Sequence, residues 1–411
     1  MKKLLFILFL LYTALGFSNT IIVKEKDQPQ AIQNAINKAH DGDTILIHKG
    51  IYRENTINVN KRVFIKGIGG PVIDGEKKNE ILVVNRDGVI IEGLTVKNGG
   101  YSSYNDIAAI RLVNVRNVIV RNNTLENTFF GIYSQHGTNC IIIGNRLKSN
   151  AKDEQNSANG IHCWKSDSMQ ILGNSITGHR DGIYFEFVTN SVIQGNNSFD
   201  NVRYGLHFMF SNNDTYIANT FSNNGAGVAV MFSHHVDMIR NKFIDNWGAS
   251  SYGILLKEIS DGTISGNEFR RNSTGVYMEG SNRLAFSKNS FTNNGWALKI
   301  QASCDGNSFI HNNFSSNSFD VATNGSLVLS SFDSNYWDKY EGYDLNHNGI
   351  GDIPFRPVSV YSMIVERNPT SLMLFRSFMV SLLDKSEKVI PGLTPENLKD
   401  DHPKMKPFVL E

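Results

Sequence analysis

Cysteine is scarce in this chain of 411 residues, which contains three: Cys140, Cys163 and Cys304. An odd and sparse count excludes a small scaffold held together by disulfides. Cys140 and Cys304 lie about seven repeats apart in the sequence, so we do not expect them to meet. We therefore expect the three thiols to be buried as small apolar side chains.

Excess charge of either sign is also lacking, because basic and acidic residues leave a formal net charge of +1. Such a balance excludes attraction of the whole molecule to nucleic acid or to acidic polymers, although it does not exclude local patches. We expect no nucleic-acid partner.

A hydrophobic run long enough to cross a bilayer is missing as well. The run Leu4–Leu11 follows Lys2 and Lys3 and is too short for a membrane span. A basic start, a short apolar stretch and small residues near Ser18 predict a secretory signal peptide over residues 1–18, with an uncleaved N-terminal anchor as the alternative. Export through such a leader predicts a periplasmic protein.

The chain has instead one repeated phrase, in which an asparagine is followed two residues later by phenylalanine, leucine or isoleucine. The steps between the asparagines are mostly 22 or 23 residues, with two longer steps of 29 and 26. A glycine followed by isoleucine, leucine or valine alternates with this phrase. The asparagines are Asn123, Asn145, Asn174, Asn197, Asn219, Asn241, Asn267, Asn289 and Asn312, and the glycines are Gly131, Gly160, Gly182, Gly205, Gly227, Gly253 and Gly275.

A repeat of 22 residues is too short for a pair of helices, but it accommodates three short strands and three turns. Apolar and polar residues alternate within each copy, as in strands with one buried face. The sequence therefore predicts an all-β chain folded as a right-handed parallel β-helix with coils of about 22 residues, the handedness being the base-rate choice. We expect the asparagines to adopt left-handed backbone angles and to form amide ladders, with the phenylalanines stacked inside.

The two ends differ from the coils and divide the chain further. Apolar residues between Gln28 and His40 fall on one helical face and predict a helix that caps the first coil of a β-helix spanning residues 19–335. Residues 336–357 are rich in Asx and glycine and predict a capping loop. Residues 358–411 lack the repeat and predict a helical tail, interrupted at Pro369, that packs on the rod, a membrane surface or a partner.

Strand alternation predicts which side chains point away from the interior. Counting from the repeat glycine, positions +2 and +4 point outward. The +2 column contains Tyr133, His162, Tyr184, His207, Ala229, Leu255 and Tyr277, and the +4 column contains Gln135, Trp164, Glu186, Met209, Met231, Lys257 and Glu279.

The middle coils thus place imidazoles and thioethers on one exposed strip, close enough for a pair to share an ion. Imidazole and thioether together suit copper, particularly Cu(I). The candidate copper ligands are His162, His207, Met209, Met231, His234 and His235. The alternative is a strip that docks a protein partner without binding metal.

A second candidate metal site lies in the capping loop. Asp344, Asn346, Asn348 and Asp352 supply oxygens at positions 1, 3, 5 and 9 of a calcium-like loop, but Phe355 replaces the glutamate expected at position 12. A calcium site and an Asx-rich turn closed by its own hydrogen bonds both fit this pattern.

An enzyme is the alternative function, since many β-helices are polysaccharide lyases, hydrolases or epimerases. Enzymes that act on uronates need a base and a group that neutralises the substrate carboxylate. Arg180, Asp181 and Arg203 are the best candidates for such roles, whereas Glu186, Glu279 and Lys257 are spread along the strip. Paired carboxylates for glycoside hydrolysis are not apparent in the sequence.

The segment Asn335–Pro357, with its Tyr-Trp-Asp and Asp-Leu-Asn-His-Asn-Gly-Ile-Gly-Asp, resembles the C-terminal signature of the NosD family. Residues 369–383 and 400–405 resemble the same family, as do the repeats and the opening Asp41-Gly-Asp-Thr44. The likeness covers nearly the whole chain after the leader.

This resemblance implies a periplasmic scaffold, peripheral to the inner membrane, that helps to assemble the copper–sulfur centre of nitrous oxide reductase. Its implied partners are the permease and ATPase of an ABC transporter, a copper chaperone and the apo-reductase. It implies a copper-handling role without turnover chemistry, and the hydrophobic tail is then the expected permease contact. A carbohydrate-active lyase or C5-epimerase is the alternative.

Overall fold

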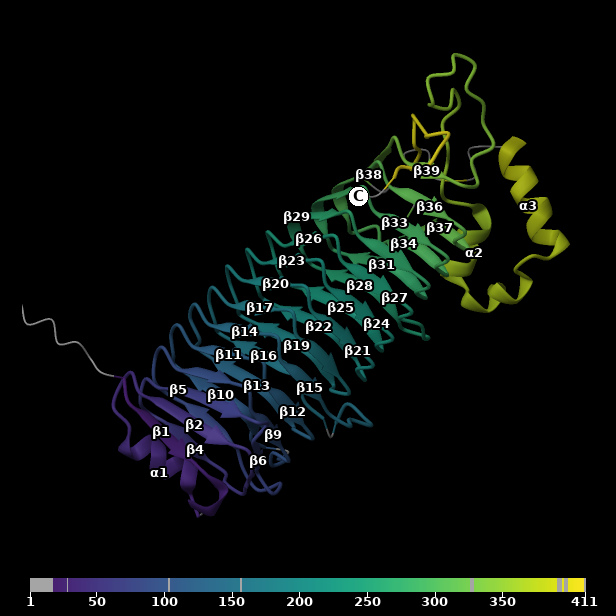
Figure 1. Cartoon of the computed structure of the whole chain (residues 1–411). Helices are drawn as coiled ribbons and strands as arrows, with labels where there is room; N and C mark the ends of the chain where they lie inside the picture. Colours follow the sequence, from purple (N-terminus) through teal and green to yellow (C-terminus); the bar gives the residue numbers. More distant parts are fainter. Residues whose placement is uncertain are drawn as a thin grey trace, which may run out of the picture.

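The structure, a computed structural model, describes residues 18–27, 29–102, 104–155, 157–325, 329–389, 394 and 398–409. It is a long rod in which strands of successive coils pair in parallel (Figure 1). The expected parallel β-helix is confirmed, and its coils repeat at the expected length, as in the pairing of Leu125 with Leu147. The predicted signal peptide falls on residues that, except for Ser18, lie outside the described part of the chain.

Three parallel sheets, here called sheets A, B and C, form the sides of the rod, and each full coil adds one strand to each sheet. Sheet A contains β1 Thr20–Val23, β2 Thr44–His48, β5 Phe64–Ile68, β8 Ile90–Glu92, β11 Ile119–Arg121, β14 Ile141–Ile143, β17 Gln170–Leu172, β20 Val192–Gln194, β23 Thr215–Ile217, β26 Asp237–Ile239, β29 Ser260–Ser265, β32 Asn282–Ser287, β35 Asp305–Ile310 and β38 Leu329–Asp333. Sheet B contains β3 Ile51–Tyr52, β6 Val72–Asp74, β9 Thr95–Lys97, β12 Thr124–Glu126, β15 Arg146–Lys148, β18 Ser175–Thr177, β21 Asn197–Phe199, β24 Thr220–Ser222, β27 Lys242–Ile244, β30 Glu268–Arg270, β33 Ser290–Thr292, β36 Asn313–Ser315 and β39 Tyr336–Trp337. Sheet C contains β4 Ile57–Val59, β7 Leu82–Val84, β10 Ala108–Val113, β13 Phe130–Gln135, β16 Ile161–Trp164, β19 Asp181–Glu186, β22 Tyr204–Met209, β25 Ala226–Met231, β28 Tyr252–Lys257, β31 Thr274–Glu279, β34 Trp296–Ile300 and β37 Phe319–Ala322.

The helices lie at the two ends of the rod (Figure 1). They are α1 Ala31–Lys38, α2 Val360–Arg367 and α3 Phe378–Val389, with short 3₁₀ turns η1 Glu25–Asp27 and η2 Pro369–Leu374. In the part of the chain that the structure describes, no helix combines the length and the apolar composition needed to cross a membrane.

Aromatic side chains stack inside the rod, as the repeat predicts. The ring centroids of Phe243 and Phe269 are 4.8 Å apart, and the stack ends with Trp337 at 4.1 Å from Phe314. A single coil cannot bury these rings, so the stacking of neighbouring coils supplies the core of the molecule. The three cysteines are buried and free, as expected.

The repeat asparagines form a buried amide ladder along the rod. Both the backbone N–H and Nδ2 of Asn145 donate to Oδ1 of Asn174, at 2.9 and 3.1 Å, and neighbouring coils repeat this pattern. The ladder was predicted correctly, but its backbone was not. The positive φ belongs to the residue just before each ladder asparagine, for example Asn122, whose φ is 55°.

The predicted position of one ladder asparagine is wrong by one residue. Asn196, and not Asn197, belongs to the ladder, because its Nδ2 donates to Oδ1 of Asn219 at 3.0 Å. The inward position that phenylalanine occupies in the next coil is filled here by Ser198, which pairs with Phe221 in β24. The phrase pointed to Asn197 because Phe199 follows it two residues later, whereas Asn196 is followed at that position by Ser198.

The N-terminal helix α1 covers the open end of the first coils, as predicted. It buries Ala31, Ile32, Ala35 and Ile36 against the core. Glu54 accepts hydrogen bonds from the backbone N–H groups of Ile32 and Gln33, at 3.0 and 3.2 Å, and so satisfies two donors of the first turn.

The C-terminal tail is broken at Pro369, as expected, but the residues that follow do not form one continuous helix. Residues Pro369–Leu374 form the 3₁₀ turn η2, and α3 begins only at Phe378, after Arg376 adopts a φ of 65°. Helix α2 lies against β37, where Tyr361 and Val365 pack on Phe319.

Candidate functional site

The register of sheet C confirms both outward columns. Tyr133 pairs with His162, His162 with Tyr184, and Tyr184 with His207. In the same strands Glu186 pairs with Met209, and Met209 with Met231. The residues between them, such as Phe208, lie in the core cluster.

The expected exposure of this strip is wrong for its two histidines. His162 is 7% exposed and His207 is 6% exposed, although both point away from the interior core. Neighbouring rings cover them: Tyr133 of the preceding coil stacks on His162 at 4.5 Å, and Tyr204 of the same strand lies 4.9 Å from His207. Burial lowers the pKa of His162 to about 3, and the charge of Arg180 contributes in the same direction, so this imidazole is neutral at physiological pH.

Tyr184 separates the two histidines, and the expectation that they share an ion is not supported. Its ring lies 4.7 Å from the ring of His162 and 4.7 Å from the ring of His207. His162 and His207 therefore belong to strands two apart in sheet C, about 9.6 Å by strand spacing. That separation is too long for one metal ion to bind both rings.

Asp181 anchors a buried polar network beside His207. Arg203 donates two hydrogen bonds to its carboxylate, at 2.9 and 2.5 Å, and Nδ1 of His207 lies 3.7 Å from Oδ2. Burial raises the pKa of Asp181, but the hydrogen bonds from Arg203 and the nearby His207 outweigh burial and hold it at about 2. The network fixes the orientation of the His207 ring, and Nε2 of that ring is buried without a hydrogen-bond partner.

His207, Met209 and Met231 are the candidate ligands that the structure brings together. His207 and Met209 are two residues apart in β22 and share its outward face, and Met231 is the partner of Met209 in β25. Both methionines are partly exposed. The hydroxyl of Tyr184 donates to Sδ of Met209 at 3.5 Å, so this hydroxyl also lies beside the His207 group.

His234 and His235 lie in the turn that leads from β25 to β26, after the outward face of sheet C has ended. Both are exposed, and their rings are 5.3 Å apart. His234 pairs with Ser260 of sheet A, and the described contacts do not join either ring to Met231. The structure therefore does not bring these two residues into the His207 group.

The chemistry of the His207 group fits Cu(I). In the described ranges, no three His, Cys, Asp or Glu side chains come together as a metal site, so a nitrogen and oxygen set suited to zinc is not found there. One imidazole nitrogen without a partner and two thioethers are soft donors, which Cu(I) prefers.

The calcium-like loop is closed by its own hydrogen bonds. Oδ2 of Asp344 accepts from the N–H of Gly349 at 2.8 Å, Oδ1 of Asn348 accepts from Ile350 at 2.8 Å, and Oδ2 of Asp352 accepts from Leu345 at 2.8 Å. These bonds match the Asx-rich turn that the sequence allowed. Calcium binding by Asp344, Asn346, Asn348 and Asp352 stays a prediction.

The residues of the enzyme alternative meet, but in a buried position. Nε of Arg180 lies 3.8 Å from Oδ2 of Asp181, and Arg203 pairs with the same carboxylate. Asp181 has no exposed surface, so this arrangement does not offer it to a polymeric substrate. Lys257 and Glu279 pair with each other at 3.3 Å farther along the strip.

Sequence reasoning missed a partly exposed aromatic ladder beside the methionines. Phe187, Phe210 and Phe232 stack at the corner after sheet C, each 5.1 Å from the next. All three have positive φ, near 50°. Their signal was available, because each phenylalanine follows the +4 residue of its coil.

Comparisons with known proteins agree with this architecture. The model of the family described as "Periplasmic copper-binding protein (NosD)" matches residues 149–349, which include the His207 group and the start of the capping loop. A Pseudomonas aeruginosa protein named "Probable ABC transporter binding protein NosD" is 26% identical over 376 residues, covering 87% of each chain. The protein of the same name from Stutzerimonas stutzeri is 27% identical over 362 residues, covering 82% of this chain and 81% of that one.

Solved structures share the fold across different functions. The A-module of the mannuronan C-5 epimerase AlgE6 from Azotobacter vinelandii superposes with a TM-score of 0.52 at 16% identity, covering 76% of this chain and 93% of the module. The surface adhesin PfbA of Streptococcus pneumoniae superposes with a TM-score of 0.55 at 13% identity, covering 78% and 93%. An enzyme and an adhesin on one fold show that the fold does not decide the activity. The family model and the two sequence relatives do identify the lineage: the chain belongs to the NosD family.

Proposed function

We propose that this protein is a periplasmic accessory factor that handles copper during assembly of the copper–sulfur centre of nitrous oxide reductase. In this role it docks on an ABC transporter, which consists of a permease and a cytoplasmic ATPase, receives Cu(I) from a copper chaperone and presents it to the apo-reductase. Copper is cargo in this scheme, and the protein performs no turnover chemistry.

The observation that carries the proposal is the group of His207, Met209 and Met231. Asp181 and Arg203 lie 3.7 and 3.4 Å from Nδ1 of the imidazole, while Nε2 has no hydrogen-bond partner. The thioethers of Met209 and Met231 are partly exposed on the same outward face, and thioethers suit Cu(I). The description of the family as copper-binding and the names of the relatives support the same role.

We propose that the C-terminal tail makes the contact with the transporter. One side of its helices packs on the rod through Tyr361, Val365 and Val380. Other side chains remain in solvent, including Phe378, which is 82% exposed, and Met373, Met379 and Leu382. An apolar surface of this kind at one end of a rod suits contact with a membrane-embedded permease.

The alternative of a polysaccharide lyase or C5-epimerase has weaker support. Its best acid and base candidates converge on Asp181, which is buried and ion-paired with Arg203. A base for proton abstraction must reach the substrate, and a carboxylate with a pKa near 2 is a weak base. Release of unsaturated or epimerised uronates by the purified protein would favour this alternative.

A complementation experiment tests the proposed function. Cells that lack the protein are expected to make a nitrous oxide reductase deficient in its copper–sulfur centre, and the wild-type chain restores the copper content of the purified reductase. The double variant His207→Ala, Met209→Ala is expected to fail while accumulating in the periplasm. A control with His136→Ala and Met405→Leu removes one imidazole and one thioether outside the copper site and the docking surface, and it is expected to restore the centre. Full restoration by the site variant would overturn the assigned site.

A further inference from the structure

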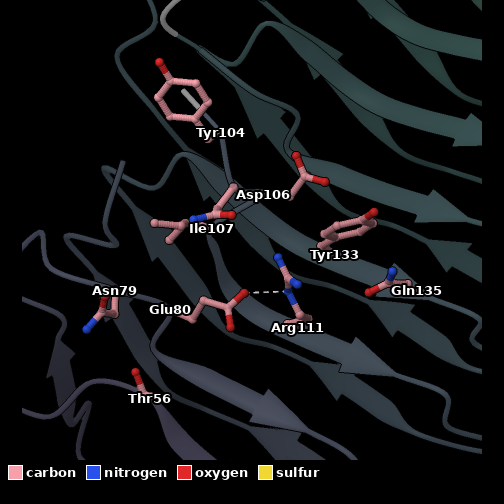
Figure 2. A pocket seen from close by; sticks show the side chains of 10 residues that line it. Thr56, Asn79, Glu80, Tyr104, Asp106, Ile107, Arg111, Tyr133 and Gln135 are labelled. Carbon is pink, nitrogen blue, oxygen red and sulfur yellow. Dashed lines mark ion pairs between the residues drawn. The ribbon is translucent and has the colours of Figure 1, made fainter. Parts of the chain in front are cut away.

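A polar pocket lies on sheet C near the N-terminal end of the rod, several coils from the His207 group. Its volume is about 610 Å³, and it lies between the loop that precedes β10 and the first strands of sheet C (Figure 2). Its polar lining includes Asn79, Glu80, Asn105, Asp106, Arg111 and Gln135. The proposed copper function uses none of them.

The charges in the pocket are nearly balanced, and the remaining charge is negative. Arg111 is held by Glu80, with Nε and Oε1 2.5 Å apart, and its guanidinium lies 5.2 Å from the ring centre of Tyr133. Asp106 adds a second carboxylate (Figure 2). A uronate or another anion would meet two carboxylates and one neutralised guanidinium, so the pocket disfavours anionic ligands.

The hydrogen-bonding groups favour hydroxyl-rich ligands. The amides of Asn79, Asn105 and Gln135 each offer donors and an acceptor. Each carboxylate adds two acceptor oxygens, and the guanidinium adds N–H donors. A ligand with adjacent hydroxyl groups, each both donor and acceptor, matches such a mixed set better than a ligand with a single kind of polar group.

An exposed aromatic ring adjoins these polar groups. Tyr104 is 98% exposed at the edge of the pocket, where its face is open to a flat apolar surface such as one side of a sugar ring. A second pocket of about 450 Å³ lies against the same loop and is lined by Tyr101 and Phe129. Two pockets with tyrosines from one loop suit a chain of several sugar units rather than a monosaccharide.

We infer that this pocket binds a neutral oligosaccharide, with Tyr104 under a sugar ring and Glu80, Asp106 and Asn79 bonding its hydroxyls. The binding is non-catalytic and independent of the proposed copper site. In an exported protein, such a site would attach the β-helix to a neutral glycan.

The test is calorimetric titration of the purified full-length mature chain with four oligosaccharides: chitotetraose, cellotetraose, tetra-mannuronate and fully deacetylated chitosan tetramer. At least one neutral tetrasaccharide is expected to bind, and the anionic one is not. Tyr104→Ala is expected to weaken that binding about tenfold, whereas Tyr343→Ala, at another exposed tyrosine, leaves it unchanged.

A charge variant separates hydroxyl recognition from simple attraction. The double variant Glu80→Gln, Asp106→Asn removes both negative charges and keeps the shape of both side chains. It is expected to retain neutral binding within about fivefold and to gain tetra-mannuronate binding. The inference is overturned if neither neutral ligand binds at 10 mM, if only the cationic or the anionic tetramer binds, or if Tyr104→Ala binds like the wild type. Unchanged thermal unfolding of each variant shows that the coils are intact.

Discussion

Asp400, from the extreme C-terminal segment, occupies the place that the next asparagine of the buried ladder would take after Asn335. Its Oδ2 accepts hydrogen bonds from the backbone N–H and from Nδ2 of Asn335, both at 2.9 Å, and from Nε1 of Trp337 at 3.0 Å. Its Oδ1 accepts from the N–H of Ser334 at 3.0 Å. The tail thus ends the ladder with an acceptor-only side chain, which satisfies donors that the last coil leaves unpaired.

Removing this carboxylate is expected to destabilise the C-terminal end strongly. Asp400→Ala leaves several buried donors without acceptors, and we expect a loss of about 2–4 kcal/mol in the free energy of unfolding. Asp400→Asn supplies one acceptor but turns an NH₂ group toward Ser334, so an intermediate loss is expected. Urea unfolding measures both, and Asp401→Ala is the matched control at an exposed neighbour. Equal stability of the two Asp400 variants and the control would contradict the role of the cap.

We expect the same cap to protect the rod from end-to-end association. Lys404 pairs with Tyr336 and with Ile350, so residues 398–409 cover backbone groups of the last coil and of the loop beyond it. A chain truncated after residue 397 exposes these groups, and open strand edges promote association. We expect oligomers by light scattering at concentrations where the full chain is monodisperse. A truncated chain that stays as monodisperse as the full chain would show that the edge is protected in another way.

A buried carboxyl predicts an unusual dependence of stability on pH. Burial raises the pKa of Asp214 to about 8, although the N–H of Ser191 donates to its Oδ1 at 2.8 Å, and Oδ2 has no partner. The unfolded carboxyl titrates near about 3.9. Between these values the folded state binds more protons than the unfolded state, so this group lowers the free energy of unfolding as pH rises from about 4 to 8.

Asp214→Asn removes the titration and keeps an acceptor for Ser191. We expect the variant to be more stable than the wild type at pH 8 by more than about 2 kcal/mol, with the difference vanishing near pH 4. Asn307 supports this substitution, because its Oδ1 accepts from the N–H of Leu284 in an equivalent ladder position. Thermal unfolding across this pH range checks it, and a difference that is constant with pH would contradict the raised pKa.

The exposed apolar side chains of the tail are expected to contact the transporter. Phe378→Ser and Met379→Ser remove exposed apolar area and leave the packed side of the tail unchanged. We expect at least about a tenfold weaker association of this variant with the detergent-solubilised permease–ATPase complex. Trp247→Ser, at another exposed apolar residue, is the control. Wild-type association of the tail variants would place the contact elsewhere on the rod.

The columns of sheet C could be predicted from sequence because strand alternation is rigid once the register is known. His162 and His207 follow their glycines at the same offset, and the structure keeps them on the outward face. Their burial could not be predicted, because it depends on the ring of Tyr133 covering His162 and the ring of Tyr204 covering His207. Alternation gives the direction of a side chain but not what covers it.

Other features depend on contacts between segments distant in sequence. The link from Asp400 to Asn335 joins residues 65 apart, and nothing local to either residue signals it. The choice of Asn197 over Asn196 was wrong for another reason. Both keep a step of 22 or 23 residues, Phe199 favoured Asn197, and only the pairing of Ser198 with Phe221 assigns Asn196 to the ladder. The left-handed residue before each ladder asparagine varies in type, from glycine to arginine, so it leaves no sequence pattern.

The most direct test of the central claim is an anaerobic Cu(I) titration of the purified mature chain against a chromophoric chelator. We predict one tightly bound Cu(I) per chain. Binding is expected to be at least about tenfold weaker in the double variant His207→Ala, Met209→Ala and unchanged in the control His136→Ala, Met405→Leu. Wild-type affinity in the first double variant, or loss of binding in both, would contradict a site built from His207, Met209 and Met231.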